Sequence, residues 1–547
     1  MAPRGKPRGW KRWIGLVINL LLFGVALGVL KHVLTEYKLA DIITSLHRIG
    51  WPLIAASLGL TVLGYGALVG YDYLSLRIAG HPIPIRRMWS ASFISHAVQN
   101  SAPIAIVAGG GVRYRLFRRL GVSGTETAAV VAGNLLTFVI GLFAVAGLSF
   151  VLAPVAIPDS FHLPVTSLRP VGIVFLVAVV GTLVAAELGV ASVRIFKWRL
   201  ELPKGGMLRE QLGVSVADWL LSSAALYVLM VAAGPVSFPQ FLSGFLLAQI
   251  VTQVVPLPGG IGVFEAAILL LRPHDTAAPL VTAALLLYRV IYYLVPLFFA
   301  TAILALESSR KPNSSVSPAT RVAREVAPHL FAVLTFITGC MLLVFDILPG
   351  GVTHIRWIGN LLQIALIEGS HFIGSLVGTG LILLAFGLER ELRSAFHLTV
   401  AFLLLGIPAA ILGAGDVRSA AILIVLLLLL LTARNEFTRT IPFTAEPLNA
   451  GWVGASIVAV LGIGWLGIYL QVRHEYTRSL WWRFALDDGA PRALRATLGV
   501  LLAVAVFVIA RLVTRARRSG HIVRRRAGRP RATSRAKTKG RAAPRRS

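Results

Sequence analysis

Apolar segments of membrane-spanning length recur along almost the whole chain, separated by short polar loops. A helix that crosses the hydrocarbon core of a bilayer needs about 20 apolar residues, which is more than a soluble core requires. The pattern therefore predicts an all-α polytopic membrane protein with about twelve transmembrane helices. The expected crossings are residues 14–30, 52–70, 126–152, 170–190, 213–232, 279–304, 328–348, 360–386, 396–412, 418–433, 452–471 and 496–513.

Two further apolar stretches, 89–108 and 241–271, do not fit as single crossings. Basic loops of a membrane protein face the cytoplasm, and the first stretch has arginines on both sides, at Arg87 before it and Arg113 after it. The crossing 279–304 must end in the cytoplasm because a basic segment follows it, so the second stretch has to leave and return on the outer side. We therefore expect two re-entrant hairpins that enter the bilayer from opposite leaflets.

The second hairpin is broken at Pro256 to Gly260, and Glu265 follows the break. Proline removes a backbone donor, and a broken helix survives in lipid only where protein buries it or where it lines a water-filled cavity. An ionisable group at such a place predicts function. The order span, span, hairpin, span occurs twice with every direction reversed, which is an inverted-topology repeat of the kind found in transporters.

These segments divide the chain into five parts with both ends in the cytoplasm. The parts are a basic N-terminus (1–13), a first membrane module with both hairpins (14–307), a linker (308–327), a second membrane module (328–514) and a disordered basic tail (515–547).

Composition agrees with a membrane protein, since 56% of the 547 residues are hydrophobic and the mean hydropathy is +0.77. The net charge of +30 suggests nucleic acid at first, but residues 511–547 alone hold 15 Lys and Arg without an acid. The rest of the excess lies mostly in short loops, and no recognition motif accompanies it, so we expect anionic membrane lipids and no nucleic acid as partners. Cys340 is the only cysteine, which excludes a disulfide framework and a thiolate metal site.

Charged residues within the first module are the candidates for substrate contact, because each costs about 2.5–3.5 kcal/mol near the centre of a membrane helix. Arginine can fork onto a phosphodiester and a carboxylate can accept from an ammonium group, so a zwitterionic or cationic lipid headgroup fits them. The alternative is mutual pairing, for example of Glu265 with Arg289, which would only lock two helices. The candidates are Asp72, Arg113, Arg115, Asp218, Glu265 and Arg289.

Neutral polar residues and helix breakers near the hairpins could line a path, or could only satisfy backbone freed by the breaks. They are Gln99, Asn100, Gln249, Gln253, Pro258, Gly259 and Gly260. In the second module Glu368 and His371 share a helix face. Two ligands are too few for a metal site, so we favour a polar contact between spans over a proton-linked role. Enzymatic motifs are missing, and we expect no metal and no cofactor.

Four sequence motifs resemble the membrane part of the multiple peptide resistance factor family, the bifunctional lysyl-phosphatidylglycerol flippase and synthase. The motifs are residues 258–265, 110–116, 368–372 and 481–486, and the resemblance covers about residues 10–515. It implies translocation of aminoacylated phosphatidylglycerol to the outer leaflet of the bacterial cytoplasmic membrane, which confers resistance to cationic peptides.

On this resemblance Asp72, Arg113 and Glu265 match polar positions of the flippase portion. Family members that make the lipid continue into a soluble acyltransferase-like domain, whereas this chain continues into a basic tail. We therefore expect a non-enzymatic flippase whose lipid is made by a separate synthase. A flippase of another phospholipid, a scaffold that recruits a synthase, and an integral-membrane enzyme are the alternatives, and a homodimer stays open.

Overall fold

The computed structural model describes most of the two membrane modules. The described residues are 39–101, 105–154, 167–190, 192–195, 198–201, 203, 205–254, 263–272, 276–309, 318–347, 360–414, 417–443, 499–511 and a few positions between 456 and 464. The expected crossings 14–30 and, apart from those few positions, 452–471 lie outside them, as does the basic tail.

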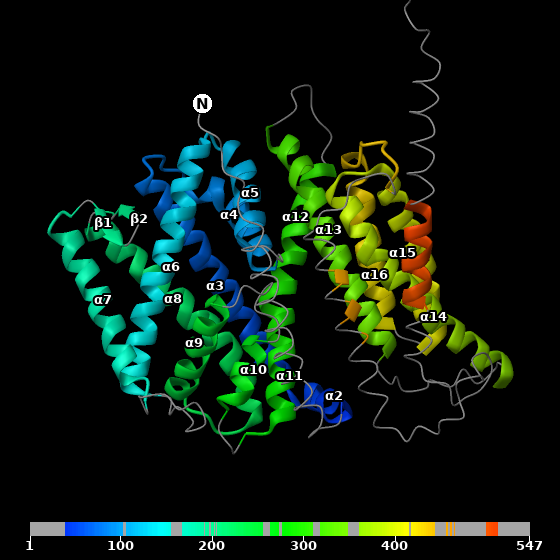
Figure 1. Cartoon of the computed structure of the whole chain (residues 1–547), viewed down its shortest axis with the longest axis horizontal. Helices are drawn as coiled ribbons and strands as arrows, with labels where there is room; N and C mark the ends of the chain where they lie inside the picture. The colour runs from blue at the N-terminus through cyan, green and yellow to red at the C-terminus, as the bar shows by residue number, and fades with distance from the viewer. Residues whose placement is uncertain are drawn as a thin grey trace, which may run out of the picture.

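Helices dominate both modules and run roughly parallel to one axis of the molecule (Figure 1). Eight of the described helices are long and apolar enough to cross a membrane, and two shorter apolar helices follow, at Ser419–Thr432 and Gly499–Arg511. The eight candidate spans are Trp51–Ile78, Gly124–Leu152, Arg169–Glu187, Gly205–Ala233, Ala278–Leu306, Ala327–Val344, Phe372–Glu389 and Arg393–Ile411. The expectation of an all-α polytopic membrane protein is confirmed.

The first module contains the elements that position the candidate residues. Its helices are α2 (Leu39–Arg48), α3 (Trp51–Ile78), α4 (Ile85–Ser101), α5 (Ala105–Arg118), α6 (Gly124–Leu152), α7 (Arg169–Glu187), α8 (Gly205–Met230), η2 (Val231–Ala233), α9 (Phe238–Val254), α10 (Val263–Leu270), α11 (Ala278–Arg289), η4 (Val290–Leu294) and α12 (Val295–Ser309). The segment η4 is a π-helical stretch that joins α11 and α12 into one span.

Two helix pairs in this module, α4 with α5 and α9 with α10, are too short to cross a bilayer. The longest of these helices has 17 residues, or about 26 Å at 1.5 Å per residue. The two helices of each pair pack against each other, and the two pairs lie toward opposite ends of the module (Figure 1). These are the two hairpins that the loop charges predict.

The arrangement also reproduces the expected inverted repeat. Helix α3 precedes the first hairpin and α8 precedes the second, and these two helices pack against each other at the centre of the module. Helix α6 follows the first hairpin and lies tightly against α8, where a Cβ built at Gly141 would overlap the side chain of Ser215. It begins at a capping box in which the Ser123 hydroxyl accepts from the Glu126 amide, because a helix N-terminus leaves backbone donors unpaired.

Two local features differ from the sequence-based expectation. Helix α3 continues to Ile78 instead of ending near residue 70, so Asp72 lies within the helix and not at its end. The basic loop after α7 forms an antiparallel hairpin of β1 (Ser192–Ile195) and β2 (Trp198–Glu201). Apolar and polar residues alternate along these strands, and that period of two is the signature of a β-strand.

The second module consists of α13 (Pro318–Ile347), α14 (Asn360–Glu389), α15 (Arg393–Ala414), α16 (Val417–Thr432) and η5 (Arg434–Glu436). Its own buried cluster forms around Leu381, Leu403 and Leu426. Helix α12 of the first module packs against α13 and α16, so the two modules share an interface.

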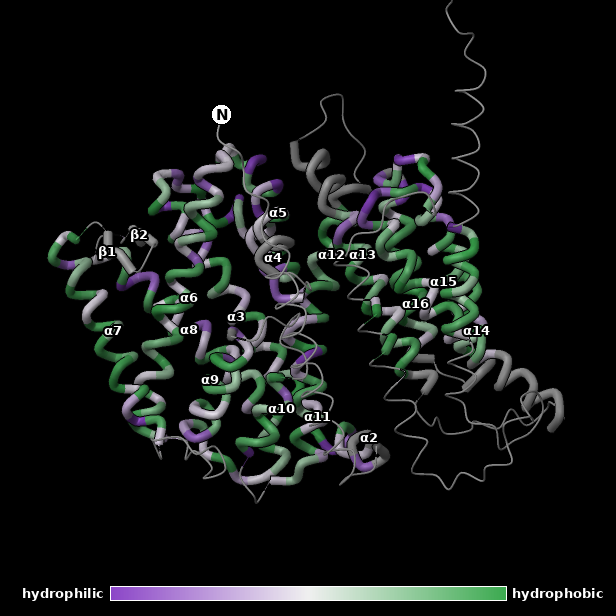
Figure 2. The backbone as a smooth tube through the Cα atoms, in the orientation of Figure 1, coloured by the Kyte–Doolittle hydropathy of each residue, from purple (hydrophilic) through white to green (hydrophobic). Residues whose placement is uncertain are grey.

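Hydrophobic residues cover most of the length of the helices, and polar stretches lie mainly toward the two ends (Figure 2). A few polar stretches interrupt this pattern within the first module, near α3 and α4. Two apolar clusters lie in the same module: one is built mainly from α3 to α5 and α12, and the other mainly from α6 and α8 to α11. The interior polar residues are therefore the natural place to look for a site.

Candidate functional site

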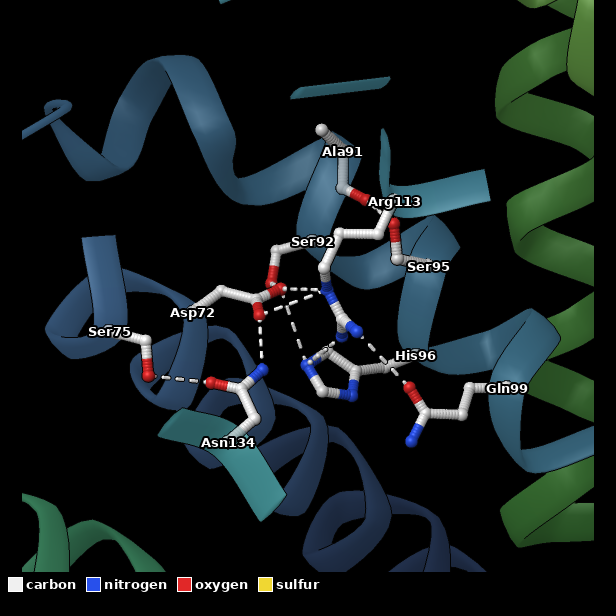
Figure 3. Close-up of polar contacts among 9 residues, drawn as sticks. All are labelled: Asp72, Ser75, Ala91, Ser92, Ser95, His96, Gln99, Arg113 and Asn134. Atoms are coloured by element: carbon white, nitrogen blue, oxygen red, sulfur yellow. Dashed lines mark hydrogen bonds and ion pairs between the residues drawn. The ribbon is translucent and has the colours of Figure 1, made fainter. Parts of the chain in front are cut away.

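The carboxylate of Asp72 on α3 forms the centre of a buried polar network that holds the first hairpin (Figure 3). Arg113 of α5 forms an ion pair with it, with Nε 3.1 Å from Oδ1. Ser92 of α4 donates to Oδ2 at 2.6 Å, and Asn134 of α6 donates to Oδ1 at 2.5 Å. One carboxylate thus connects both hairpin helices to the spans on either side of them.

The guanidinium of Arg113 has further partners along α4. It donates to the Gln99 side-chain oxygen at 3.3 Å, and its other terminal nitrogen lies 3.1 Å from His96 Nε2. That histidine nitrogen is also 3.3 Å from Asp72. The carboxylate and guanidinium are almost inaccessible, at 0% and 2% exposure. Burial at this depth suits an anchor better than a contact for a ligand, because a ligand would have to displace the whole network.

A second ion pair holds the second hairpin. Glu265 lies in the first turn of α10, and its Oε1 accepts from Nε of Arg289 at the end of α11, at 2.6 Å. The two side chains keep 23% and 18% exposure, so this pair is more accessible than the first. The guanidinium also lies over the ring of Tyr293, 4.8 Å from its centroid, which favours a cation at this place.

The π-helical segment η4 is the place where the two hairpins approach the same stretch of chain. At its start, Arg289 binds the second hairpin through Glu265. Within it, the carbonyl of Tyr293 accepts from Ser101 at the end of α4, at 3.2 Å. A π turn loosens the regular ladder, which leaves carbonyl groups for such contacts, and π segments recur at functional sites. The end of α4 in the first hairpin and the first turn of α10 in the second therefore both bind this irregular turn or the residue that precedes it.

Tyrosines fill the space around this turn. The Tyr65 hydroxyl on α3 donates to the carbonyl of Tyr292 at 3.2 Å and accepts from Asn100 at 3.3 Å. The rings of Tyr288 and Tyr292 stack with centroids 5.2 Å apart. This aromatic layer connects α3 to η4 and, through Asn100, to the end of α4 in the first hairpin.

Asp218 on α8 lies in a third polar position, apart from both ion pairs. Its Oδ2 accepts from the Tyr71 hydroxyl at 3.1 Å, and the same hydroxyl lies 2.8 Å from Ser215 Oγ. The side chain is buried, at 5% exposure, and Oδ1 has no hydrogen-bond partner in the described part of the chain. Asp218 is thus brought near the other candidates without joining either pair.

The remaining predicted residues have more peripheral positions. Arg115 is half-buried on α5, Gln249 is half-buried on α9 and accepts from Thr252, and Gln253 is exposed at the end of α9. Pro258, Gly259 and Gly260 lie outside the described residues. Glu368 and His371 lie on α14 as expected, but their side chains are not described.

Sequence reasoning missed several members of the network. Ser92 and His96 were not among the candidates; together with the predicted Gln99 they follow each other at spacings of four and three on α4, which places the three on one helix face toward Asp72. That periodicity was available as a signal. Asn134 lies in the middle of a mainly apolar span, and nothing in the sequence alone connects it to Asp72. Among the described residues no group of three His, Cys, Asp or Glu side chains could hold a metal ion.

Comparison with known proteins matches the first module. Residues 13–300 match the family model described as "Lysylphosphatidylglycerol synthase TM region". The chain is 34% identical to the "Uncharacterized protein slr0712" of Synechocystis sp. over 282 residues, which is 51% of this chain and 87% of that protein. It is 32% identical to the "Inner membrane protein YbhN" of Escherichia coli over 261 residues, 47% of this chain and 81% of that protein.

Longer relatives match as well. The "Phosphatidylglycerol lysyltransferase" of Bacillus subtilis is 23% identical over 297 residues, which is 48% of this chain but only 34% of that protein. The similarity is thus confined to part of the lysyltransferases, whereas it extends over most of the two shorter proteins.

Proposed function

Because the chain belongs to the family of lysylphosphatidylglycerol synthase TM regions, we propose that this multi-pass membrane protein moves an aminoacylated phosphatidylglycerol from the inner to the outer leaflet. The proposal concerns transport and not synthesis. It places the protein in the bacterial cytoplasmic membrane, with the end that carries Arg77, Arg118 and Arg209 in the cytoplasm. Exposure of such a lipid would lower the negative surface charge and so protect against cationic peptides.

The observation that carries the proposal is the opposite charge of the two hairpins. In each hairpin the second helix contributes one charged side chain to an ion pair, which is Arg113 from α5 and Glu265 from α10. Their partners are Asp72 and Arg289. Two short hairpins at opposite ends that meet at η4 are typical of alternating-access transporters, where binding sites lie at the interface of inverted repeats.

The Glu265–Arg289 pair is the part of the site best suited to a headgroup. An aminoacylated phosphatidylglycerol carries an ammonium group and a phosphodiester, and a carboxylate with an arginine can receive these two. The pair is partly exposed, and Tyr293 offers an aromatic face for a cation. Lipid binding would then exchange the internal ion pair for two contacts with the substrate, so opening the pair leaves no charge unpaired.

The Asp72–Arg113 pair has a different part in this proposal. Its burial and its partners on α3, α4, α5 and α6 make it the anchor of the first hairpin. Breaking such a buried pair costs about 3–5 kcal/mol when one partner is removed. We therefore expect this hairpin to move as a unit with α3 and α6.

Lipid translocation by the purified protein tests the proposal. The protein is reconstituted in vesicles with fluorescent lysyl-phosphatidylglycerol, and the fraction accessible to a membrane-impermeant quencher is followed over time. The wild-type protein should accelerate translocation over protein-free vesicles, and Glu265→Gln should reduce it at least tenfold. The matched control is Glu210→Gln, which removes a carboxylate from an exposed pair with Arg77 at the basic end of α8.

A charge exchange separates headgroup contact from simple pairing. In the double variant Glu265→Arg with Arg289→Glu the ion pair can form in reverse. If the pair only locks two helices, this variant should recover activity; if it binds the headgroup, activity should stay low because the charges face the wrong groups. Equal translocation by empty and protein-containing vesicles would refute the transport proposal, and faster movement of unmodified phosphatidylglycerol would assign another lipid.

A further inference from the structure

Asp218 differs from the two other carboxylates in the core of the first module. Asp72 and Glu265 each bind an arginine. Asp218 instead accepts only from the Tyr71 hydroxyl, through Oδ2, and its Oδ1 lies buried without a hydrogen-bond partner in the described part of the chain. An ionised carboxylate in this position would keep its charge in an apolar interior with a single neutral donor, which is strongly unfavourable.

The surroundings of Asp218 contain phenols and no described cation. Tyr71 of α3 donates to it, and Tyr65 of α3, Tyr288 of α11 and Tyr292 of η4 are near enough to interact with its charge. Helix α6 approaches through Gly141, beside Ser215. A phenol is neutral near pH 7 and can donate only one hydrogen bond, so these neighbours cannot replace a counter-ion.

Neutralisation by a proton satisfies this geometry. An O–H bond at Oδ1 removes the charge, while Oδ2 stays available as the acceptor for Tyr71. We propose that Asp218 is a proton-binding site of the first module, which takes up one proton at Oδ1 from one side of the membrane and releases it to the other. The bond forms and breaks at this oxygen, and no other group changes its protonation.

A polar line connects this site to the basic end of the module. Gln211, Ser215 and Asp218 follow one another on α8 at spacings of four and three, hence on one face. All three are buried, and Gln211 Oε1 also lacks a hydrogen-bond partner within the described residues. Buried polar atoms without partners usually bind water or an ion, so this line offers a route for a proton past apolar helices.

The aromatic layer connects the site to the hairpins. Tyr65 lies between α3 and η4 and contacts the tip of the first hairpin through Asn100. Tyr292 of the same layer follows Arg289, the partner of Glu265, by three residues. Uptake or loss of a proton at Asp218 would therefore change the charge beside the turn that both hairpins share. This coupling rests on the proposed lipid transport and would supply its energy source, whereas proton binding itself does not depend on it.

Infrared difference spectroscopy of the purified protein tests proton binding without any transport. The wild type should show a carbonyl stretch of a protonated carboxylic acid that shifts in deuterium oxide and is lost at high pH. This band should be missing in Asp218→Asn and present in the control Glu210→Gln. Asp218→Glu should retain a band at a shifted frequency. The same band in Asp218→Asn, with the protein still monodisperse, would overturn the proposal.

Vesicles with a pH gradient test the coupling. If one proton is exchanged per lipid, a gradient of about one pH unit can support at most about a tenfold difference in the amount of lipid between the two leaflets. Wild type and Asp218→Glu should build up an asymmetry that reverses with the gradient, and Asp218→Asn should give none while still exchanging lipid. Gradient-driven asymmetry in Asp218→Asn, or asymmetry driven by sodium at equal pH, would refute the coupling. If no variant moves lipid, the proposed function fails, and the infrared band alone decides the proton site.

Discussion

Replacement of Asp72 by asparagine is the sharpest perturbation of the first hairpin. The substitution preserves shape but removes the negative charge that faces Arg113, whose guanidinium is 2% exposed. Asparagine keeps one acceptor oxygen, so a contact with Ser92 can persist. Its amide group, however, now meets the donors of Asn134 and Arg113, which lie 2.5 and 3.1 Å from Oδ1 in the native protein.

The magnitude follows from the charge left behind. Removing one partner of a buried ion pair costs about 3–5 kcal/mol, because the other charge stays desolvated. In a membrane protein the unfolded state also finds polar partners, which reduces such losses, so we expect about 3 kcal/mol. An exposed pair should cost less than about 1 kcal/mol, and Glu210→Gln at the Arg77–Glu210 pair provides this control.

Reversible unfolding of the purified protein in mixed micelles measures both free energies of unfolding. Adding Arg113→Met to Asp72→Asn removes the orphaned charge and should recover at least half of the loss. Hydrogen exchange should localise the loosening in Asp72→Asn to α4 and α5. A loss in Asp72→Asn no larger than in Glu210→Gln, or a double variant less stable than the single one, would show that the pair does not anchor the hairpin.

Three further predictions concern the helix arrangement. Gly141→Ala should destabilise the protein by about 1–3 kcal/mol, since the added methyl group overlaps Ser215 on α8; thermal unfolding tests this, and unchanged stability would contradict the close contact. Ser123→Ala should cost about 0.5–2 kcal/mol by removing the cap of α6, with faster hydrogen exchange in its first turn as the measurement. The third prediction uses a variant without the native cysteine and a membrane-impermeant maleimide. The reagent should label Leu270→Cys in intact cells, but Arg118→Cys only after the cells are permeabilised. Labelling of both positions from the same side would rule out hairpins that enter from opposite leaflets.

Much of the fold could be predicted from the sequence because lipid restricts the choices. Backbone groups in a bilayer must pair within a helix, so apolar length and loop charge nearly determine the spans. The opposed hairpins were expected from the arginines on both sides of 89–108 and from the basic segment after 279–304, and the helix breakers before Glu265 located the break in the second hairpin. The small β-hairpin was missed because its strands have four residues each within a loop that was considered only for its charge.

The site was harder to predict than the fold. The sequence supplied the charged residues and even the pairing of Glu265 with Arg289 as an alternative, but not the partner of Arg113. Pairing across helices depends on rotation and depth of each helix, which hydrophobic periodicity does not determine. For the same reason Asp218 could not be distinguished from Asp72, although the structure gives an arginine to one and only a tyrosine to the other.

The π turn at Val290–Leu294 has a consequence for the whole length of its span. A turn that contains one additional residue advances every later side chain by about 100° around the helix axis. The π turn η4 therefore determines the rotation of α12 about its own axis. Helix α12 is also the helix that packs against α13 and α16. If this turn were ever to tighten into regular α-helix, the stripe of α12 that faces the second module would swing away from it. A change of helix type at the place where Ser101 and Arg289 make their contacts would thus alter the packing of the second module.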